Sequence, residues 1–240
     1  DSMILATLDK DQKTISLTSF MRDLYVAIPG YSSTRINAAY AYGGMDLLDE
    51  TLTQNFGVEI DGNVEVDFEV FQVLVDKVGG IDLELTQAEA DYICGRDQSV
   101  LYPQPLRTDW DLQEGMNHLD GEQALIHARN RSIGNSDYRR TERQQEVLMA
   151  AFEKVKDLSA FSIAGLVKDV LPLVTTDLSF TEIIGYAMDV MSIGTGDIAT
   201  YRIPEDGAYT PQTISGMQVL VPDLEQNRKY LQQVLYHAEA

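Results

Sequence analysis

Arginine side chains gather in one short stretch of an otherwise acidic chain. Five of the eleven arginines fall between residues 129 and 143, although the 240-residue chain carries a formal net charge of −20. Arginine stays charged, and its planar guanidinium can donate two parallel hydrogen bonds to one phosphate or carboxylate group. This stretch is therefore the first candidate for an anion-binding site.

Helical spacing predicts that part of this cluster faces the protein interior. Residues 137–158 are expected to form a helix with an apolar stripe at Val147, Leu148, Ala151, Phe152 and Val155. Four or seven residues before this stripe come Arg140, Arg143 and Gln144, which continue the same face toward the helix start. Buried charges need partners, and an anion bound near a helix N-terminus, where free N–H groups point outward, would be one.

A structural explanation of the same cluster stays open. The chain is rich in carboxylates, and arginines that point inward can pair with them to form an ion-pair network without any ligand. The sequence alone gives the two explanations about equal weight.

A second polar group lies where an early strand should end. Arg22 and Asp23 follow a β-rich run at 14–19, and strand ends are where α/β sheets usually carry functional side chains. Proteins hold Mg²⁺ with one or two carboxylates and with phosphate oxygens of the substrate. Asp1 could be such a ligand, although taken alone it is only a terminal acidic residue.

Several other kinds of site are excluded by missing residues. No glycine-rich nucleotide-binding motif, zinc-protease motif or nucleophile elbow occurs. The single cysteine, Cys94, rules out an internal disulfide, and the three scattered histidines are expected to be structural. The negative charge and the lack of a base-reading helix argue against nucleic acid as a partner.

Strand-like and helix-like segments alternate along the chain, which predicts the α/β class. Early hairpin-like strands make the expected central β-sheet mixed, inside an α-β-α sandwich, and no linker divides residues 1–240, so we expect one domain. The expected strands are 3–8, 14–19, 24–28, 64–68, 81–85, 198–203 and 218–221, and the expected helices are 45–56, 71–78, 121–129, 137–158, 162–171, 180–191 and 223–238. Residues 31–35 and 91–118 are expected to be loops.

The order of seven short motifs resembles the LytR-CpsA-Psr family, from residue 1 to about residue 156. The motifs are Asp1-Ser2-Met3-Ile4-Leu5, Leu17-Thr18-Ser19-x-x-Arg22-Asp23, Arg35-Ile36-Asn37-Ala38-Ala39-Tyr40-x-x-Gly43-Gly44, Val75-Asp76-x-x-Gly79-Gly80-Ile81, Leu119-Asp120-Gly121-Glu122-Gln123-Ala124-Leu125, Ala128-Arg129-x-Arg131 and Asp137-x-x-Arg140-x-x-Arg143-Gln144.

This resemblance implies a phosphotransferase that moves a glycopolymer, such as teichoic acid or capsular polysaccharide, from a polyprenyl-pyrophosphate carrier to peptidoglycan. The residues that it implies for the pyrophosphate are Arg22, Arg129, Arg131, Arg140 and Gln144, with Arg143 of secondary weight. It further implies Asp137 as an acidic residue beside them and Asp1 as a ligand of a Mg²⁺ cofactor.

The resemblance also implies a location on the extracellular face of a bacterial cell membrane, with a membrane anchor. The sequence opens at Asp1, directly in a strand-like run, so we expect the anchor and an upstream strand with a further metal-site aspartate to lie before it. Met21 stands where the family usually has proline.

Two other functions remain open at the level of sequence. The same arginines would serve a pyrophosphatase that releases the polymer phosphate to water. They would also serve a non-catalytic module that binds polyprenyl phosphates or anionic glycans.

Overall fold

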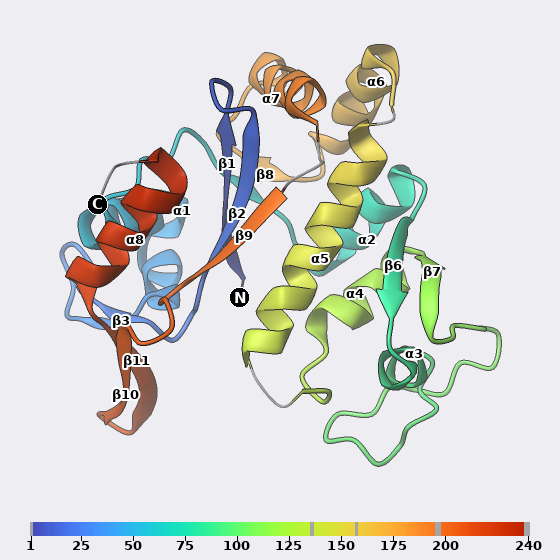
Figure 1. Cartoon of the computed structure of the whole chain (residues 1–240), viewed down its shortest axis with the longest axis horizontal. Helices are drawn as coiled ribbons and strands as arrows, with labels where there is room; N and C mark the ends of the chain where they lie inside the picture. The colour runs from blue at the N-terminus through green and yellow to red at the C-terminus, as the bar shows by residue number, and fades with distance from the viewer. Residues whose placement is uncertain (1, 135–136, 157, 195–197, 238–240) are drawn as a thin grey trace. The chain divides into compact units, whose positions relative to one another are not determined.

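The computed structural model describes residues 2–134, 137–156, 158–194 and 198–237. The chain divides into two compact units (Figure 1). Unit 1 comprises residues 1–63 and 198–240, and unit 2 comprises residues 64–197. Whether both units act as the single domain expected for residues 1–240 stays a prediction.

A mixed three-stranded sheet with the order β1-β2-β9 forms the centre of unit 1. Strands β1 (Met3–Asp9) and β2 (Thr14–Phe20) form an antiparallel hairpin, and β9 (Ile198–Ile203) runs parallel to β2. The hairpin turn is held by the Asp9 carboxylate, which accepts hydrogen bonds from the N–H groups of Asp11 and Gln12. The α/β class and the mixed central sheet predicted from the sequence are therefore confirmed.

Two helices of unit 1 pack on the same face of this sheet. Helix α1 (Asn37–Phe56) and helix α8 (Leu224–Tyr236) contact each other, and aromatic pairs join them to the strands. Ring centroids lie 5.3 Å apart for Phe20 and Phe56, and 6.0 Å apart for Tyr201 and Tyr230. Because Tyr201 is the register partner of Thr18, it points to the same face as Phe20.

The structure corrects several element boundaries in unit 1. Helix α1 begins at Asn37 rather than at residue 45, because Gly43 and Gly44 leave helical geometry and interrupt the periodicity that marks its start. The expected strand 24–28 shortens to β3 (Tyr25–Val26), and β4 (Thr34–Arg35) lies in the expected loop 31–35. Strand β10 (Tyr209–Ile214), which contains a proline, was missed, and it pairs with β11 (Met217–Pro222).

Unit 2 is mainly helical and packs around one apolar core. In chain order it contains β5 (Val64–Glu65), α2 (Phe68–Lys77), β6 (Ile81–Leu85), α3 (Gln87–Ile93), β7 (Gly115–Leu119), α4 (Gly121–Arg129), α5 (Asp137–Lys156), α6 (Ala160–Val170), β8 (Thr175–Thr176) and α7 (Phe180–Ile193). Its buried core includes Ile81, Ile93, Leu119 and Val147. Among the described residues, no helix of either unit is both long and apolar enough to cross a membrane.

Two predictions in unit 2 are wrong. The alternating run 64–68 is a strand only over Val64–Glu65, because the Asp67 carboxylate accepts a hydrogen bond from the Val70 N–H and starts helix α2. The expected loop 91–118 begins inside α3 and ends inside β7, which pairs with β6. The short β7 run has little alternation of its own, so its strand depends on this pairing.

Helices α2 and α4 approach each other closely at Gly121, the first residue of α4. Its N–H donates to the Asp76 carboxylate at 2.7 Å. A Cβ atom at Gly121 would lie 2.2 Å from the Gln72 carbonyl oxygen, so only glycine fits between the two backbones.

We therefore expect Gly121→Ala to destabilise the protein by about 1–3 kcal/mol, since overpacking forces the α2 backbone to move. Gly185→Ala is the matched control, because Gly185 is an exposed helical glycine with open space where a Cβ would lie. Gly185→Ala should stabilise the protein by roughly 0.5–1 kcal/mol. Urea unfolding followed by circular dichroism measures both changes, and equal changes would contradict the proposed close approach.

Candidate anion-binding site

The arginine cluster of unit 2 lies where helix α4 ends and helix α5 begins. Arg129 is the last residue of α4, and Arg131 follows in the connecting loop. Arg140, Arg143 and Gln144 lie in the first turns of α5. The two helices contact each other, so residues from both gather around the end of α4.

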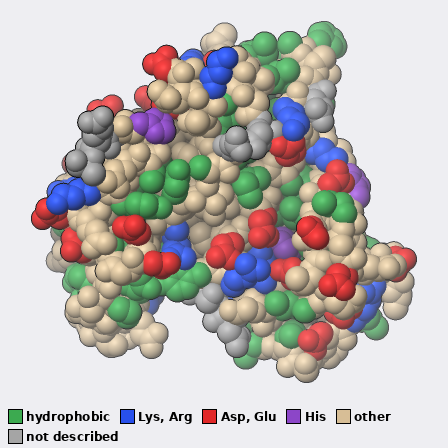
Figure 2. Space-filling view, in the orientation of Figure 1, with side chains coloured by type: hydrophobic (Ala, Val, Ile, Leu, Met, Phe, Trp, Pro, Cys, Tyr) green, Lys and Arg blue, Asp and Glu red, His purple; other side chains and the backbone are tan. Residues whose placement is uncertain are grey.

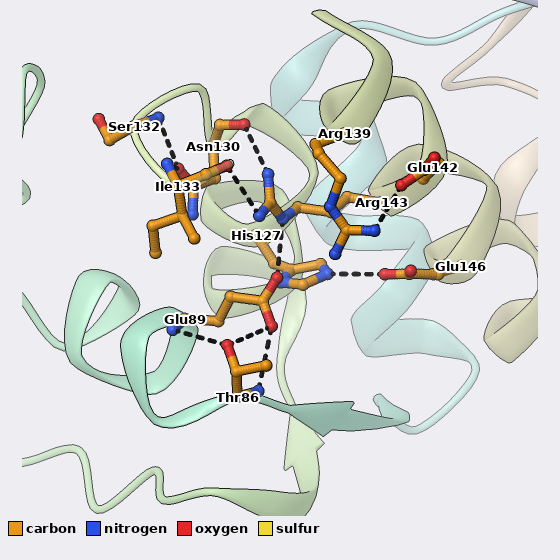
Figure 3. A network of polar contacts seen from close by, with 10 residues as sticks. All are labelled: Thr86, Glu89, His127, Asn130, Ser132, Ile133, Arg139, Glu142, Arg143 and Glu146. Atoms are coloured by element: carbon orange, nitrogen blue, oxygen red, sulfur yellow. Dashed lines mark hydrogen bonds and ion pairs between the residues drawn. The ribbon is translucent and has the colours of Figure 1, made fainter. Parts of the chain in front are cut away.

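Arg143 is the most buried member of the cluster, with only 1% of its surface exposed. Its Nε donates to the Glu89 carboxylate at 2.9 Å, its Nη1 to the Asn130 carbonyl at 3.2 Å and its Nη2 to the Ile133 carbonyl at 3.1 Å (Figure 3). A carboxylate and two backbone carbonyls thus surround this guanidinium. These contacts are the ones that the structural ion-pair explanation predicts for Arg143.

Glu89, on helix α3, is held in turn by the start of its own helix. The N–H and hydroxyl of Thr86 donate to Glu89 Oε2 at 3.0 and 2.8 Å, while Arg143 takes Oε1. Burial alone would raise the pKa of Glu89, but the hydrogen bonds from Thr86 and Arg143 outweigh it and hold the pKa below its ordinary value. Glu89 is therefore a buried anion at neutral pH.

Asn130 turns the chain at the end of α4 with its side chain fully buried. Its Oδ1 accepts hydrogen bonds from the N–H groups of Ser132 and Ile133 at 2.9 and 3.2 Å. The residues on either side of it, Arg129 and Arg131, are exposed. A buried anchor thus presents two arginines to solvent, where they could bind an anion.

Arg129 also packs on an aromatic ring. Its guanidinium carbon lies 4.2 Å from the ring centroid of Phe68, the first residue of α2. Phe68 is 53% exposed, so the pair lies at the surface. A cation over an aromatic face gains roughly 0.5–1 kcal/mol at such sites, which orders the arginine without neutralising its charge.

The inward direction predicted for the start of α5 is confirmed for Arg140 and Arg143, of which Arg140 is 7% exposed. Gln144 is partly buried, and its Nε2 donates to the Ala128 carbonyl at a long 3.5 Å. The roles of Arg140, Arg143 and Gln144 in binding substrate stay predictions.

His127 lies beneath this cluster, almost fully buried, with its Nε2 3.4 Å from Glu146 Oε2. This position fits the structural role predicted for it. Sequence reasoning missed Glu89, Asn130 and Phe68. The only signal was the Thr86-x-x-Glu89 capping pattern, which indicates a helix start and not an ion pair.

In unit 1, Arg22 and Asp23 follow the end of β2, as predicted. Asp23 lies between two arginines, at 3.4 Å from Arg22 Nε and 3.1 Å from Arg35 Nε. The Arg35 Nη2 also donates to the Gln218 carbonyl at 2.6 Å, so Arg35 is fixed on two sides. Arg22 is partly buried, and its meeting with the arginines of unit 2 stays a prediction.

The described residues contain no group of three or more His, Cys, Asp or Glu side chains placed to hold a metal ion. The predicted metal ligand, Asp1, lies outside the described residues, as does the side chain of Asp137. The role of Asp1 as a Mg²⁺ ligand stays a prediction.

Charges on the visible face of the molecule are interspersed. Figure 2 shows acidic side chains spread over this face with small, separate groups of basic side chains between them. Small, separate groups of arginines suit a compact anion.

Buried polar anchoring and exposed arginines make the end of α4 a candidate anion-binding site in an α/β protein. The family model LytR_cpsA_psr matches residues 1–233, and the chain belongs to the LytR_cpsA_psr family. The family predicted from the sequence motifs is therefore confirmed.

Curated relatives and solved structures agree with this assignment. The chain is 30% identical over 213 residues to the polyisoprenyl-teichoic acid–peptidoglycan teichoic acid transferase TagT of Bacillus subtilis (strain 168), covering 87% of this chain and 63% of that protein. The crystal structure of B. subtilis TagV matches with a TM-score of 0.77 and 29% identity, covering 100% of this chain and 90% of the other.

A third match carries a ligand. The structure of the family protein YwtF (TagT) with bound octaprenyl pyrophosphate lipid has a TM-score of 0.73 and 25% identity, covering 98% of this chain and 85% of the other. The chain spans about three fifths of the length of the curated relatives it matches.

Because its pKa is lowered, ionised Glu89 should stabilise the protein at neutral pH, and this contribution should disappear as pH falls below about 4.5 and through its folded pKa. We expect Glu89→Gln to cost about 1–3 kcal/mol at pH 7, since it weakens charged hydrogen bonds to Arg143 and Thr86. The difference from the unsubstituted protein should shrink at acid pH.

Urea unfolding at several pH values between 3 and 8 measures this difference. Glu142→Gln is the control, because Glu142 pairs with Arg139 on the exposed side of the same cluster and exposed pairs contribute little. A Glu89→Gln difference that stayed constant across the whole pH range would contradict the buried-anion assignment.

Proposed function

We propose that this protein transfers a phosphate-linked glycopolymer from a polyprenyl-pyrophosphate carrier to peptidoglycan. The observation that carries the proposal is the pair of exposed arginines, Arg129 and Arg131, on either side of buried Asn130 in a chain of this family. Two neighbouring cations at the end of α4 suit a ligand that carries two adjacent phosphates.

The relatives support this choice of donor and acceptor. TagT of B. subtilis is named a polyisoprenyl-teichoic acid–peptidoglycan teichoic acid transferase. A TagT structure holds octaprenyl pyrophosphate. By analogy, the donor for this protein is a polyprenyl pyrophosphate that bears teichoic acid, capsular polysaccharide or a similar polymer, and the acceptor is a sugar hydroxyl of the wall.

Each cluster residue has a proposed task. Arg129 and Arg131 contact the pyrophosphate from the loop, and the partly buried Gln144 lies beside them at the start of α5. Arg140, also in the first turns of α5, neutralises charge on the transferring phosphate. For Arg22 we propose phosphate binding, the role that the family resemblance implies.

Charge governs the proposed reaction. A wall-sugar hydroxyl attacks the polymer-side phosphorus, a new P–O bond forms, and the bond to the lipid phosphate breaks. The departing lipid phosphate takes up negative charge, which preorganised guanidinium groups stabilise more strongly than water does. Asp137 is the proposed acceptor of the hydroxyl proton.

Mg²⁺ is part of the proposal as a cofactor, with Asp1 as one ligand. When bound, it would neutralise phosphate charge in the way typical of phosphoryl-transfer enzymes.

The place of action follows from the proposed substrates. Peptidoglycan and its lipid-linked precursors meet on the extracellular face of the bacterial cell membrane, so we propose that location, with a membrane anchor outside residues 1–240. Nucleic acid is not a proposed partner.

We expect Arg140→Ala to lower the transfer rate by on the order of 10²-fold, because it removes a cation that neutralises the transferring phosphate. Arg140→Lys should restore only part of the rate, since an ammonium cannot form the bidentate fork. The assay uses the full-length protein with its anchor, a polyprenyl-pyrophosphate glycan donor, Mg²⁺ and peptidoglycan. An unchanged rate in a normally folded Arg140→Ala protein contradicts the role of Arg140.

Arg139→Ala is the matched control, since Arg139 is the neighbouring residue but is exposed and paired with Glu142. It should keep nearly the full rate. The product identifies the reaction: polymer linked to peptidoglycan supports the transferase, free polymer phosphate supports a pyrophosphatase, and binding without turnover supports a carrier module.

A further inference from the structure

The loop that carries Arg131 is held from two sides. On its inner side, Asn130 Oδ1 accepts hydrogen bonds from the N–H groups of Ser132 and Ile133. From helix α5, the Arg143 guanidinium donates to the carbonyls of Asn130 and Ile133, the first and last residues of the same turn (Figure 3). Both ends of the turn are therefore tied to one rigid planar group.

The orientation of that planar group is fixed in turn by Glu89. Glu89 Oε1 accepts from Arg143 Nε, while Thr86 occupies Oε2, so the carboxylate cannot rotate away without losing several hydrogen bonds. Arg143 and Glu89 are 1% and 5% exposed, so water cannot replace either partner. The connection runs from α3 through α5 to the loop.

Hydrogen bonds from helix α5 also satisfy carbonyl groups at the C-terminal end of helix α4. The last carbonyl groups of a helix lack partners within the helix and carry partial negative charge. Arg143 and Gln144 donate to carbonyls at or just beyond this end, those of Ala128 and Asn130. Contacts from the first turns of α5 thus fix the end of α4, where Arg129 lies.

From these contacts we infer that Arg143 and Glu89 are positioning residues, which set the separation of Arg129 and Arg131 so that both engage one diphosphate group. This inference rests on the proposed function and concerns the same site. Arg143 does not touch the substrate in this role, because it is 1% exposed and its Nε and both Nη atoms each donate a hydrogen bond to the protein.

Preorganisation gives the inference a measurable consequence. With the loop fixed, a diphosphate meets both arginines without an ordering cost, while a monophosphate needs only one of them. When the loop is loosened, binding must also order it, and this entropic cost weakens the affinity mainly for the ligand that needs both cations. Loss of positioning should therefore lower the preference for diphosphate over monophosphate.

The test compares octaprenyl pyrophosphate with octaprenyl monophosphate by isothermal titration calorimetry. Arg143→Lys keeps a charge for Glu89 but cannot bridge two carbonyls as the guanidinium does. We expect it to reduce the ratio of the two affinities by about tenfold. A change that only lowers the folded fraction would reduce both affinities equally and leave their ratio unchanged.

Arg96→Lys is the matched control. Arg96 also joins a carboxylate, Asp91, to two loop carbonyls, those of Trp110 and Leu112, but in another part of unit 2. Because Arg96 is exposed, Arg96→Lys should lower stability less than Arg143→Lys does, and it should leave the affinity ratio unchanged. Glu89→Gln serves as a second variant of the positioning pair, and it should shift the ratio in the same direction as Arg143→Lys.

Each outcome has one meaning. A lowered ratio for both positioning variants, with an unchanged ratio for Arg96→Lys, supports the inference. An unchanged ratio in Arg143→Lys and Glu89→Gln overturns the inference and leaves the proposed function standing, provided that the unsubstituted protein prefers the diphosphate. If the unsubstituted protein shows no such preference, the proposed donor is wrong, and the inference fails with it.

Discussion

A buried ion pair between Arg143 and Glu89 organises the helical unit of this protein. Removing two charges from water costs several kcal/mol per ion. The pair is stable only because other groups form hydrogen bonds with the donors and acceptors that the two side chains do not use on each other. Thr86 satisfies the second carboxylate oxygen, and the Asn130 and Ile133 carbonyls accept from the guanidinium. A change at either charge would therefore disturb helix α3, helix α5 and the loop between α4 and α5 together.

The same pair links stability to the candidate site. Around it, the chain alternates between buried and exposed residues: Arg129 faces solvent, Asn130 faces the core, and Arg131 faces solvent again. Asn130 Oδ1 accepts hydrogen bonds from the backbone of its own turn, whereas the side chains of Arg129 and Arg131 stay at the surface, where a ligand can reach them. This division explains how an acidic chain can present two arginines close together at its surface.

Much of this arrangement could be predicted from local sequence. The apolar stripe around Val147 placed Arg140 and Arg143 toward the interior, because helical periodicity is a local property. The partner of Arg143 could not be predicted, since Glu89 lies 54 residues away and only tertiary packing joins them. Strand β7 was missed for the same reason, and Gly43–Gly44 hid the start of α1 by leaving helical geometry.

The central claim is that the loop arginines recognise a diphosphate. Its most direct measurement is the affinity of the chain for octaprenyl pyrophosphate in the unsubstituted protein and in a protein with Arg129→Ala and Arg131→Ala combined. Charge-assisted hydrogen bonds of this kind contribute about 1.5–3 kcal/mol each, so removing both arginines should weaken binding by on the order of 10²-fold or more at equal stability. Equal affinity in the two proteins would contradict the claim.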